Sequence, residues 1–453
     1  MRYCLLLALF LTFLQACNQS SNSTANNTTA SATPTTAAPA ATPELPPTPA
    51  PTPALTGAEA ELWAKAMKIH QASIVIDTHN DVTSAILDDG FDLAQNGIVN
   101  GRIKTHTDIA RLKAGGMGAQ FFAVYVGKEF VGKKPEEGGG AARRALDMIG
   151  VVYDQVKKHP ETFEMAYTAD DIRRIRKAGK IAALMGIEGG HAIEDSIYAL
   201  RNFHRLGIRY MTLTHTNTNN WADSEADLKK PNVKHHGGLN ELGKKVILEM
   251  NKLGMMVDIS HVSDETMSDV FEISKAPVIA SHSSARAIAN HTRNLNDDEL
   301  RAIKQNGGVV MVNFYDGFID PKKAEVTFNG RAKEEELKQQ FPNDPKRVAD
   351  ELKQWRAQYK FDKTPLSVLL DHIEHIIKVA GIDHVGLGAD LDGIGLDATP
   401  VGLEDVSQYP VLTYELLKRG HSEADIKKIL GENLLRAMAR CEQVAKERQT
   451  NAK

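Results

Sequence analysis

The chain has 453 residues, of which 42% are hydrophobic and 25% are charged, and its formal net charge is -4. This length and composition are typical of a globular protein with one large domain or two ordinary ones. The negative net charge and the absence of Lys/Arg blocks argue against a nucleic-acid partner. The three cysteines, Cys4, Cys17 and Cys441, have no C-x-x-C spacing and cannot form a disulfide framework or a thiolate zinc site.

The first 17 residues have the features of an export signal. Arg2 supplies a positive start, residues 5–14 form an apolar stretch too short to span a bilayer, and Leu14-Gln-Ala-Cys17 ends it. This tetrapeptide resembles a bacterial lipobox, whose cysteine is lipidated and becomes the first residue of the mature protein. We therefore expect Cys17 to anchor the protein to a membrane. The alternative is an ordinary cleaved signal with an incidental cysteine.

Residues 18–57 are mostly Ser, Thr, Ala, Asn and Pro, a composition that cannot bury a core. We expect a disordered tether here, followed by a folded body over residues 58–446 and a flexible tail over residues 447–453. Asn18 follows the lipobox cysteine in place of the aspartate that retains lipoproteins at the inner membrane. The sequence therefore favours the bacterial outer membrane, with the body facing the periplasm.

Eight short and nearly continuous apolar runs follow the tether, with helical segments between most of them. Such runs are typical of parallel strands that are buried on both faces. Eight strands joined by helices predict a (β/α)8 TIM barrel, and the alternative is an open, doubly wound sheet. The runs are residues 74–81, 119–126, 181–188, 210–215, 255–261, 278–282, 308–314 and 384–390. The helical segments are residues 58–71, 141–158, 196–206, 238–253, 263–273, 297–306 and 365–380.

Two insertions interrupt this alternation. Residues 128–140 are rich in Gly and Lys and are expected to form a surface loop. Residues 320–363 are strongly charged, with predicted helices over 333–340 and 345–359. Both follow strand ends and should overhang the mouth of the barrel, where the second fits a lid, an oligomer contact or a solvated helical face. Residues 422–446 predict two C-terminal amphipathic helices.

Histidines and carboxylates end six of the eight predicted strands, and all strand ends of a barrel meet at one face, where active sites lie. Such ligands without thiolates suit zinc or another catalytic divalent ion. They exceed what one ion needs, which favours two metals that share Glu188. A single histidine of this kind is more often a core residue, so the prediction depends on the joint occurrence. The residues are His79, Asp81, Glu188, His215, His261, His282 and Asp390.

Motifs along most of the chain resemble those of the membrane dipeptidase (renal dipeptidase) family, zinc metallopeptidases on an amidohydrolase-type barrel. The stretches that carry the resemblance are Asp77-Thr-His-Asn-Asp81, Gly186-Ile-Glu-Gly-Gly190, Leu213-Thr-His-Thr-Asn217, Asp258-Ile-Ser-His261, Ser281-His-Ser-Ser-Ala285, Arg293-Asn294, Val310-Met-Val-Asn-Phe314 and Gly386-Leu-Gly-Ala-Asp-Leu-Asp-Gly393.

The resemblance implies two zinc ions per chain and a dipeptide substrate, hydrolysed by a metal-activated hydroxide. In this scheme one ion is bound by His79 and Asp81, the other by His261 and His282, and both by Glu188. It further implies that His215 contacts the scissile carbonyl oxygen, that Arg293 receives the substrate carboxylate and that Asp390 transfers protons. A homodimer is expected by analogy with the family.

Two other functions are compatible with parts of this pattern. The first is a different metal-dependent hydrolase on the same barrel, acting on an N-acyl amino acid, a β-lactam or a cyclic amide. The second is a lipoprotein that binds peptides without catalysis. The second predicts lost ligands or a missing proton carrier, and the intact set from His79 to Asp390 argues against it.

Overall fold

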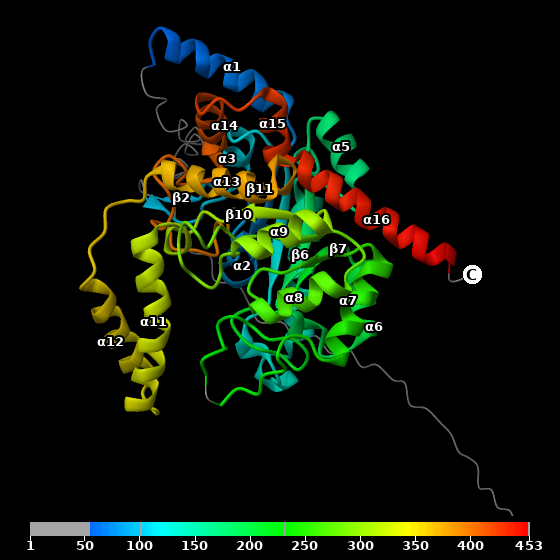
Figure 1. Ribbon diagram of the computed structural model, residues 1–453, viewed down its shortest axis with the longest axis vertical. Helices are drawn as coiled ribbons and strands as arrows, with labels where there is room; N and C mark the ends of the chain where they lie inside the picture. The colour runs from blue at the N-terminus through cyan, green and yellow to red at the C-terminus, as the bar shows by residue number, and fades with distance from the viewer. Residues whose placement is uncertain (1–54, 100–101, 231, 452–453) are drawn as a thin grey trace, which may run out of the picture. The chain divides into compact units, whose positions relative to one another are not determined.

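The computed structural model of the chain describes residues 55–99, 102–230 and 232–451 (Figure 1). The predicted signal peptide, its Cys17 and residues 18–54 of the predicted tether lie outside these ranges. Within the described ranges, no helix combines the length and the apolar character needed to cross a membrane.

Eight parallel strands, paired in chain order, form the central sheet. The first and last strands meet at their carboxyl ends through a parallel bridge between Asn80 and Leu391. There Asp81 N–H donates to the Leu391 carbonyl (2.9 Å), and Asp390 N–H donates to the His79 carbonyl (3.1 Å). This closure confirms the predicted (β/α)8 barrel. The strands are β1 (Val75–Asn80), β4 (Met117–Tyr125), β6 (Ile181–Glu188), β7 (Ile208–Thr212), β8 (Met256–Asp258), β9 (Val278–Ala280), β10 (Val309–Val312) and β11 (Val385–Leu387).

Most strands are buried along their whole length, as expected for a parallel sheet with both faces covered. Several are shorter than the apolar runs suggested, and β8 and β9 end before the histidines that follow them. The cause lies in the Asp258 side chain, which accepts from the backbone N–H groups of Ser260 (3.1 Å) and Ser281 (2.8 Å). A carboxylate therefore replaces the ladder bonds at the end of both strands.

Three short strands were not predicted. β5 (Phe163–Met165) pairs with the first residues of β6, and β7 pairs with the later ones. β2 (Ile98–Val99) and β3 (Arg102–Ile103) form an antiparallel pair outside the barrel. Runs of two or three residues are too short to show a period in the sequence.

Helices follow most strands, and side chains or glycines cap their ends. Asn240 accepts from two backbone N–H groups of the helix that it begins, and Asn296 forms a capping box with Glu299. The same two helices end at Gly254 and Gly307 in the left-handed region, where glycine has no Cβ penalty. The helices are α1 (Ala58–Ala72), α2 (Val82–Asp89), α3 (Ile109–Ala114), α4 (Ala141–Lys158), α5 (Ala169–Lys177), α6 (Ile197–Arg205), α7 (Glu241–Leu253), α8 (Asp264–Ile273), α9 (Asp297–Asn306) and α13 (Leu366–Ala380).

The second insertion forms a helical hairpin between β10 and β11. It consists of α10 (Asp316–Ile319), α11 (Pro321–Gln340) and α12 (Pro345–Ala357). α11 is longer than the predicted helix over 333–340, because Asp320 caps it and Pro321 occupies its first position. α11 and α12 lie side by side at the edge of the barrel (Figure 1). They share a small apolar cluster of their own, made by Leu337, Val348, Leu352, Phe341 and Trp355.

The C-terminal helices pack against the barrel strands. α14 (Tyr409–Lys418) and α15 (Glu423–Lys427) lead through a π-helical turn into α16 (Asn433–Asn451). The Asn433 side chain donates to the carbonyls of Ile382 (2.7 Å) and Val385 (2.8 Å), and Leu434 and Met438 join an apolar cluster with strand residues. The segment predicted as a flexible tail, 447–453, is helical as far as the described residues extend.

Candidate active site

The structure brings all seven predicted strand-end residues together at the carboxyl end of the barrel. His79 is part of β1 and Glu188 ends β6, whereas the other five lie on the turns that follow their strands. Their ligand atoms form three overlapping groups in which the atoms lie within 4.8 Å of one another. The groups are His79 with Glu188 and His282, Glu188 with His215 and His261, and His79 with Asp81 and Asp390.

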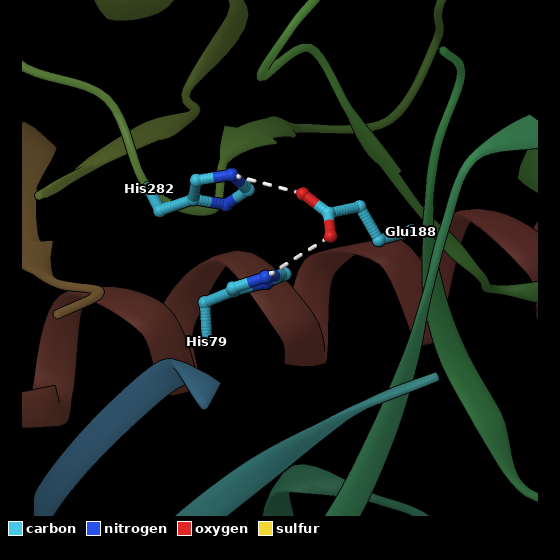
Figure 2. Close-up of side chains that lie close together, drawn as sticks. All are labelled: His79, Glu188 and His282. Carbon is cyan, nitrogen blue, oxygen red and sulfur yellow. Dashed lines mark ion pairs between the residues drawn. The ribbon is translucent and has the colours of Figure 1, made fainter. Parts of the chain in front are cut away.

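Glu188 lies at the centre, and its two carboxylate oxygens face different neighbours. Oε2 lies 3.5 Å from Nε2 of His79. Oε1 lies 3.0 Å from Nε2 of His261 and 3.2 Å from Nε2 of His282. Figure 2 shows His79 and His282 approaching opposite oxygens of this carboxylate. Asp81 belongs to the His79 side, because its Oδ2 lies 3.3 Å from Nε2 of His79.

The charge states of Glu188, His261 and His282 match those of metal ligands. Burial alone would raise the pKa of Glu188, but the surrounding histidines lower it well below its ordinary value. Burial lowers the pKa of both His261 and His282 well below the ordinary range. Glu188 is therefore ionised and His261 and His282 are neutral, the protonation states in which these groups bind cations. His79 differs, because burial would lower its pKa but Tyr210, Glu188 and Asp81 raise it well above the ordinary value.

Two of these residues have unusual backbone conformations. His261 (φ 68°) and Asp390 (φ 64°) occupy the left-handed region, as does Asp392 (φ 67°). This conformation is unfavourable for residues with a Cβ and persists only where the surrounding structure enforces it. It turns the side chains of His261 and Asp390 into the cluster after their strands have ended, which no sequence pattern indicates.

Tyr210 on β7 orients His79 and was not predicted as a site residue. Its hydroxyl donates to the Thr78 carbonyl (2.9 Å), so it accepts from Nδ1–H of His79 (2.8 Å). Nε2 therefore faces the cluster and offers its lone pair there when a cation takes the place of its proton. Nε2 itself is buried and makes no hydrogen bond among the described residues.

A second relay holds His282. The hydroxyl of Ser281 donates to Oδ2 of Asp258 (2.6 Å) and therefore accepts from Nδ1–H of His282 (2.7 Å). Thr212 donates to the same carboxylate oxygen of Asp258 (2.5 Å). The His282 Nε2 lone pair thus also faces Glu188. Both Ser281 and Asp258 lie in recognised motifs, but nothing in the sequence assigns them to this role.

Asp390 has the properties of a proton carrier. Burial is the main cause that raises the pKa of its carboxyl to about 7, with further contributions from Asp81 and Glu188 that His79 opposes. The side chain of Asn313 donates to its Oδ2 atom (2.9 Å) and fixes its orientation. A carboxyl group with a pKa near neutrality can both accept and return a proton.

His215 and Arg293 differ in how they reach the site. His215 lines the central cavity, and burial lowers its pKa to about 4, so the ring is neutral. Arg293 is 1% exposed and does not line this cavity. Its guanidinium donates to the Ser283 hydroxyl (3.2 Å) and the His282 carbonyl (3.1 Å), while its Nε–H has no hydrogen-bond partner among the described residues.

The cavity above the cluster has a volume of about 450 Å³, within the range of small-molecule sites. Its lining includes acidic groups and histidines as well as the apolar side chains of Tyr315, Phe318 and Ile394. Arg331, on the inserted helix α11, also lines it and was not predicted. The full lining is Asp81, Ser84, Tyr125, Glu188, His215, Thr216, His261, Tyr315, Phe318, Arg331, Asp390, Asp392, Gly393, Ile394 and Gly395.

Comparison with known families decides the class of this protein. A model of the family described as membrane dipeptidase (peptidase family M19) matches residues 63–452. The chain belongs to the membrane dipeptidase family. It is therefore a metal-dependent dipeptidase, as the motifs predicted.

Solved structures agree with this assignment. The membrane dipeptidase chain is 26% identical to the probable dipeptidase PvdM from Pseudomonas aeruginosa, with a TM-score of 0.70, covering 85% of this chain and 100% of that one. It is also 26% identical to a metallo peptidase from Rhodobacter sphaeroides liganded with a phosphinate mimic of the dipeptide L-Ala-D-Ala. That match has a TM-score of 0.64 and covers 82% of this chain and 99% of the other.

The dipeptidase family implies a metal cofactor, and the residues present fit one. The buried Nε2 atom of His79 lacks a hydrogen-bond partner among the described residues, and the Nε2 atoms of His261 and His282 lie 2.9 Å apart. Both nitrogens also lie close to Oε1 of Glu188, at 3.0 and 3.2 Å, so that three donor groups converge on one place and would hold a cation. Imidazole and carboxylate donors are the ligands of catalytic divalent ions.

Proposed function

We propose that this protein is a dinuclear zinc dipeptidase in which Glu188 is shared by both ions. The observation that supports this is the division of the Glu188 oxygens, Oε2 toward His79 and Oε1 toward His261 and His282. Asp81 would complete the first site. When bound, two such ions would lower the pKa of a coordinated water molecule and so supply a hydroxide nucleophile at neutral pH.

The chain's own residues would then position the substrate and move the protons. Asp390, which lies beside His79 and Asp81 in the cluster, would accept a proton from the attacking water and return it to the leaving amine. Asn313 keeps the carboxylate aimed at the cluster while this happens. Neutral His215 lines the cavity beside His261 and would donate a hydrogen bond to the carbonyl oxygen as negative charge develops there.

Arg293 would receive the free carboxylate of the dipeptide. It is buried beside His282, and its Nε–H remains available for a hydrogen bond. A guanidinium offers a planar fork that suits a carboxylate. A site that requires this terminal charge close to the cleaved bond accepts only very short peptides.

The proposal is tested by measuring metal content per chain together with hydrolysis of a dipeptide library. We expect two zinc ions per chain and turnover of unblocked dipeptides. Glu188→Ala should lower both the metal content and the rate to background, whereas Glu194→Ala, a carboxylate outside the cluster, should change neither. One ion per chain, or normal metal content in Glu188→Ala, would contradict the shared ligand. Turnover of N-acyl amino acids or lactams, without turnover of dipeptides, would contradict the dipeptide substrate and favour the alternative hydrolase.

We further propose that Cys17 carries a lipid anchor that holds the enzyme at the bacterial outer membrane, facing the periplasm. The support is the sequence Leu14-Gln-Ala-Cys17 after a short apolar stretch, followed by Asn18. Cys17→Ser should move the enzyme from the membrane fraction to the soluble fraction after cell lysis. An unchanged distribution, or an acyl-free Cys17 in the mass spectrum of the mature protein, would contradict the anchor.

A further inference from the structure

The cavity wall formed by the inserted helix α11 suggests how the enzyme selects its substrates. Among the residues that line the cavity, Arg331 is the only Arg or Lys in the described part of the chain. Its guanidinium therefore supplies the permanent positive charge of this surface. The same cavity is lined by Asp81, Glu188 and Asp390, whose charge bound cations would offset.

Two groups anchor α11 on the barrel close to the predicted metal ligands. Nη1 of Arg331 donates to Oε2 of Glu225 (2.6 Å), and the Thr292 hydroxyl donates to the same oxygen (2.5 Å). One helical turn earlier, the Phe328 ring lies 4.5 Å from Nζ of Lys229. The backbone N–H of Glu225 donates to the carbonyl of His261 (3.0 Å). The insertion is thus fastened to the loop that adjoins His261 rather than extending freely into solvent.

The contact with Glu225 leaves part of the guanidinium available to a ligand. A guanidinium has five N–H donors, and only the Nη1 bond to Glu225 is formed by Arg331 among the described residues. Glu225 is buried, with 5% of its surface exposed. Burial alone would raise the pKa of its carboxyl, but the positive charges of Arg331 and Arg293 lower it below the ordinary value. The Arg331 guanidinium is thus ion-paired with Glu225 through Nη1, and its remaining N–H donors are available at the cavity lining.

The neighbouring aromatic side chains define what kind of anion fits. Tyr315 and Phe318 line the same cavity as Arg331, and their rings meet edge to face, with centroids 4.7 Å apart. The Phe318 ring also lies 5.3 Å from the Arg293 guanidinium. A cavity lined by aromatic rings and a guanidinium suits a short methylene stem that ends in a carboxylate. The side chains of aspartate and glutamate have this form, whereas the terminal carboxylate of a dipeptide has no such stem.

We infer that Arg331 is a specificity-determining residue, brought to the cavity by the insertion, that recognises the acidic side chain of an aspartate or glutamate in the dipeptide. The inference rests on the proposed dipeptidase function and deepens it. It assigns residues 320–363 to the substrate site and gives the insertion a role beyond covering the barrel.

The test compares the isosteric substrates Ala-Glu and Ala-Gln, and separately Glu-Ala and Gln-Ala, each with L and D residues at the C-terminal position. The wild-type enzyme should prefer the acidic member of at least one pair in kcat/KM. Arg331→Gln should lower that preference about 10- to 100-fold, mainly through KM, the range for one lost hydrogen bond between charged groups. The rate on the uncharged dipeptide should fall less than the rate on the acidic one. Arg347→Gln on α12, a residue that does not line the cavity, should leave both values unchanged.

Two further variants separate recognition from anchoring. Glu225→Gln removes the anchor but keeps the guanidinium, so the preference for the acidic substrate should persist. Arg331→Lys keeps the charge without the planar fork and should give an intermediate preference for the acidic substrate. This variant also tests the inference if Arg331→Gln does not fold. Equal loss of turnover on all dipeptides in Arg331→Gln and Glu225→Gln, or no acidic preference in the wild type, would overturn the inference. Absence of turnover on every one of these dipeptides by the wild type would instead contradict the proposed function.

Discussion

At the scale of single residues, the site depends on side chains that do not themselves face the substrate. Tyr210 and the Ser281–Asp258 pair determine which nitrogen of His79 and of His282 is free to bind a cation. Such partners fix the tautomer and the ring orientation of a ligand, and losing one typically reduces metal affinity or activity. The ligands alone therefore describe only part of the centre.

Tyr210→Phe should weaken metal binding without abolishing the reaction. The change removes the acceptor of the His79 Nδ1–H bond and leaves the ring volume intact. We expect the metal affinity to fall about 10- to 100-fold, measured by competition with a chromophoric chelator. At saturating zinc, kcat should stay close to the wild-type value. The control is Tyr153→Phe, because the Tyr153 hydroxyl bonds to Tyr167 and to the Leu206 carbonyl, which are not members of the cluster. Unchanged affinity in Tyr210→Phe would show that His79 is oriented by packing alone.

Asp390→Asn should separate proton transfer from metal binding. The amide has the shape of the carboxylate but cannot carry the proton, so kcat should fall by about 10²- to 10⁴-fold. The zinc content should remain that of the wild type, since Glu188 and the histidines supply the other donors. Rates from initial velocities and metal content from emission spectroscopy check both parts. A rate near that of the wild type would mean that another group moves the proton.

At the scale of the elements, the strand ends that carry the site differ in role from the parts of the strands that the C-terminal segment covers. The carboxyl ends of the strands carry the ligands, and the turns after them can adopt strained conformations such as those of His261 and Asp390. The C-terminal segment packs against the strands, where the π-helical turn brings Gly431 against β1. A Cβ built on Gly431 would lie 2.2 Å from the carbonyl oxygen of Ile74. This close approach explains why the helix changes its pitch at a glycine.

Gly431→Ala should therefore destabilise the fold without touching the site. The added methyl group must displace backbone, and overpacking of this kind costs about 1–3 kcal/mol. The matched control is Gly150→Ala in α4, where a Cβ meets nothing within 4 Å and a helix interior gains about 0.5–1 kcal/mol from alanine. Thermal unfolding of the two variants should thus shift in opposite directions. Equal midpoints would show that the C-terminal segment adjusts freely.

At the scale of the whole molecule, the cluster connects strands that are distant in the sequence. β1, β6, β8, β9 and β11, or the turns after them, all contribute to the three overlapping groups. A cation bound there links the first strand of the barrel to the later ones across its carboxyl end. Because such a site exists only in the folded state, metal binding adds to the free energy of unfolding.

Removal of the metal should lower the thermal unfolding midpoint of the enzyme. A ligand present at about 100 times its Kd stabilises the native state by about 2.7 kcal/mol, and a chelator removes this contribution. Calorimetry with chelator, and after readdition of zinc, should show a fall and a recovery of the midpoint. Glu188→Ala, which lacks the shared ligand, should respond little to either treatment. A wild-type midpoint that is insensitive to chelator would argue against a cation that links the strands.

The sequence by itself determined the barrel and the composition of its metal cluster. Eight apolar runs have a local cause, burial on both faces, and the carboxyl ends of parallel strands meet at one edge whatever the loops do. The sequence therefore predicts that His79, Glu188 and His282 lie close together. The family motifs added the expected role of each residue, and the family match supports the class of reaction.

Only the tertiary structure decided which oxygen of Glu188 faces which histidine, how Tyr210 orients His79, and that Arg331 reaches the cavity. These contacts join residues on separate elements, and their geometry depends on side-chain rotamers and on turns with left-handed backbone, as at His261. The hydrophobic periodicity of the sequence predicts neither the side-chain rotamers nor the left-handed turns. The sequence of helix α11 is that of a charged, solvated segment. Its contacts with the loop near His261 are made by single side chains, Arg331 and Phe328, and the sequence alone does not predict their partners.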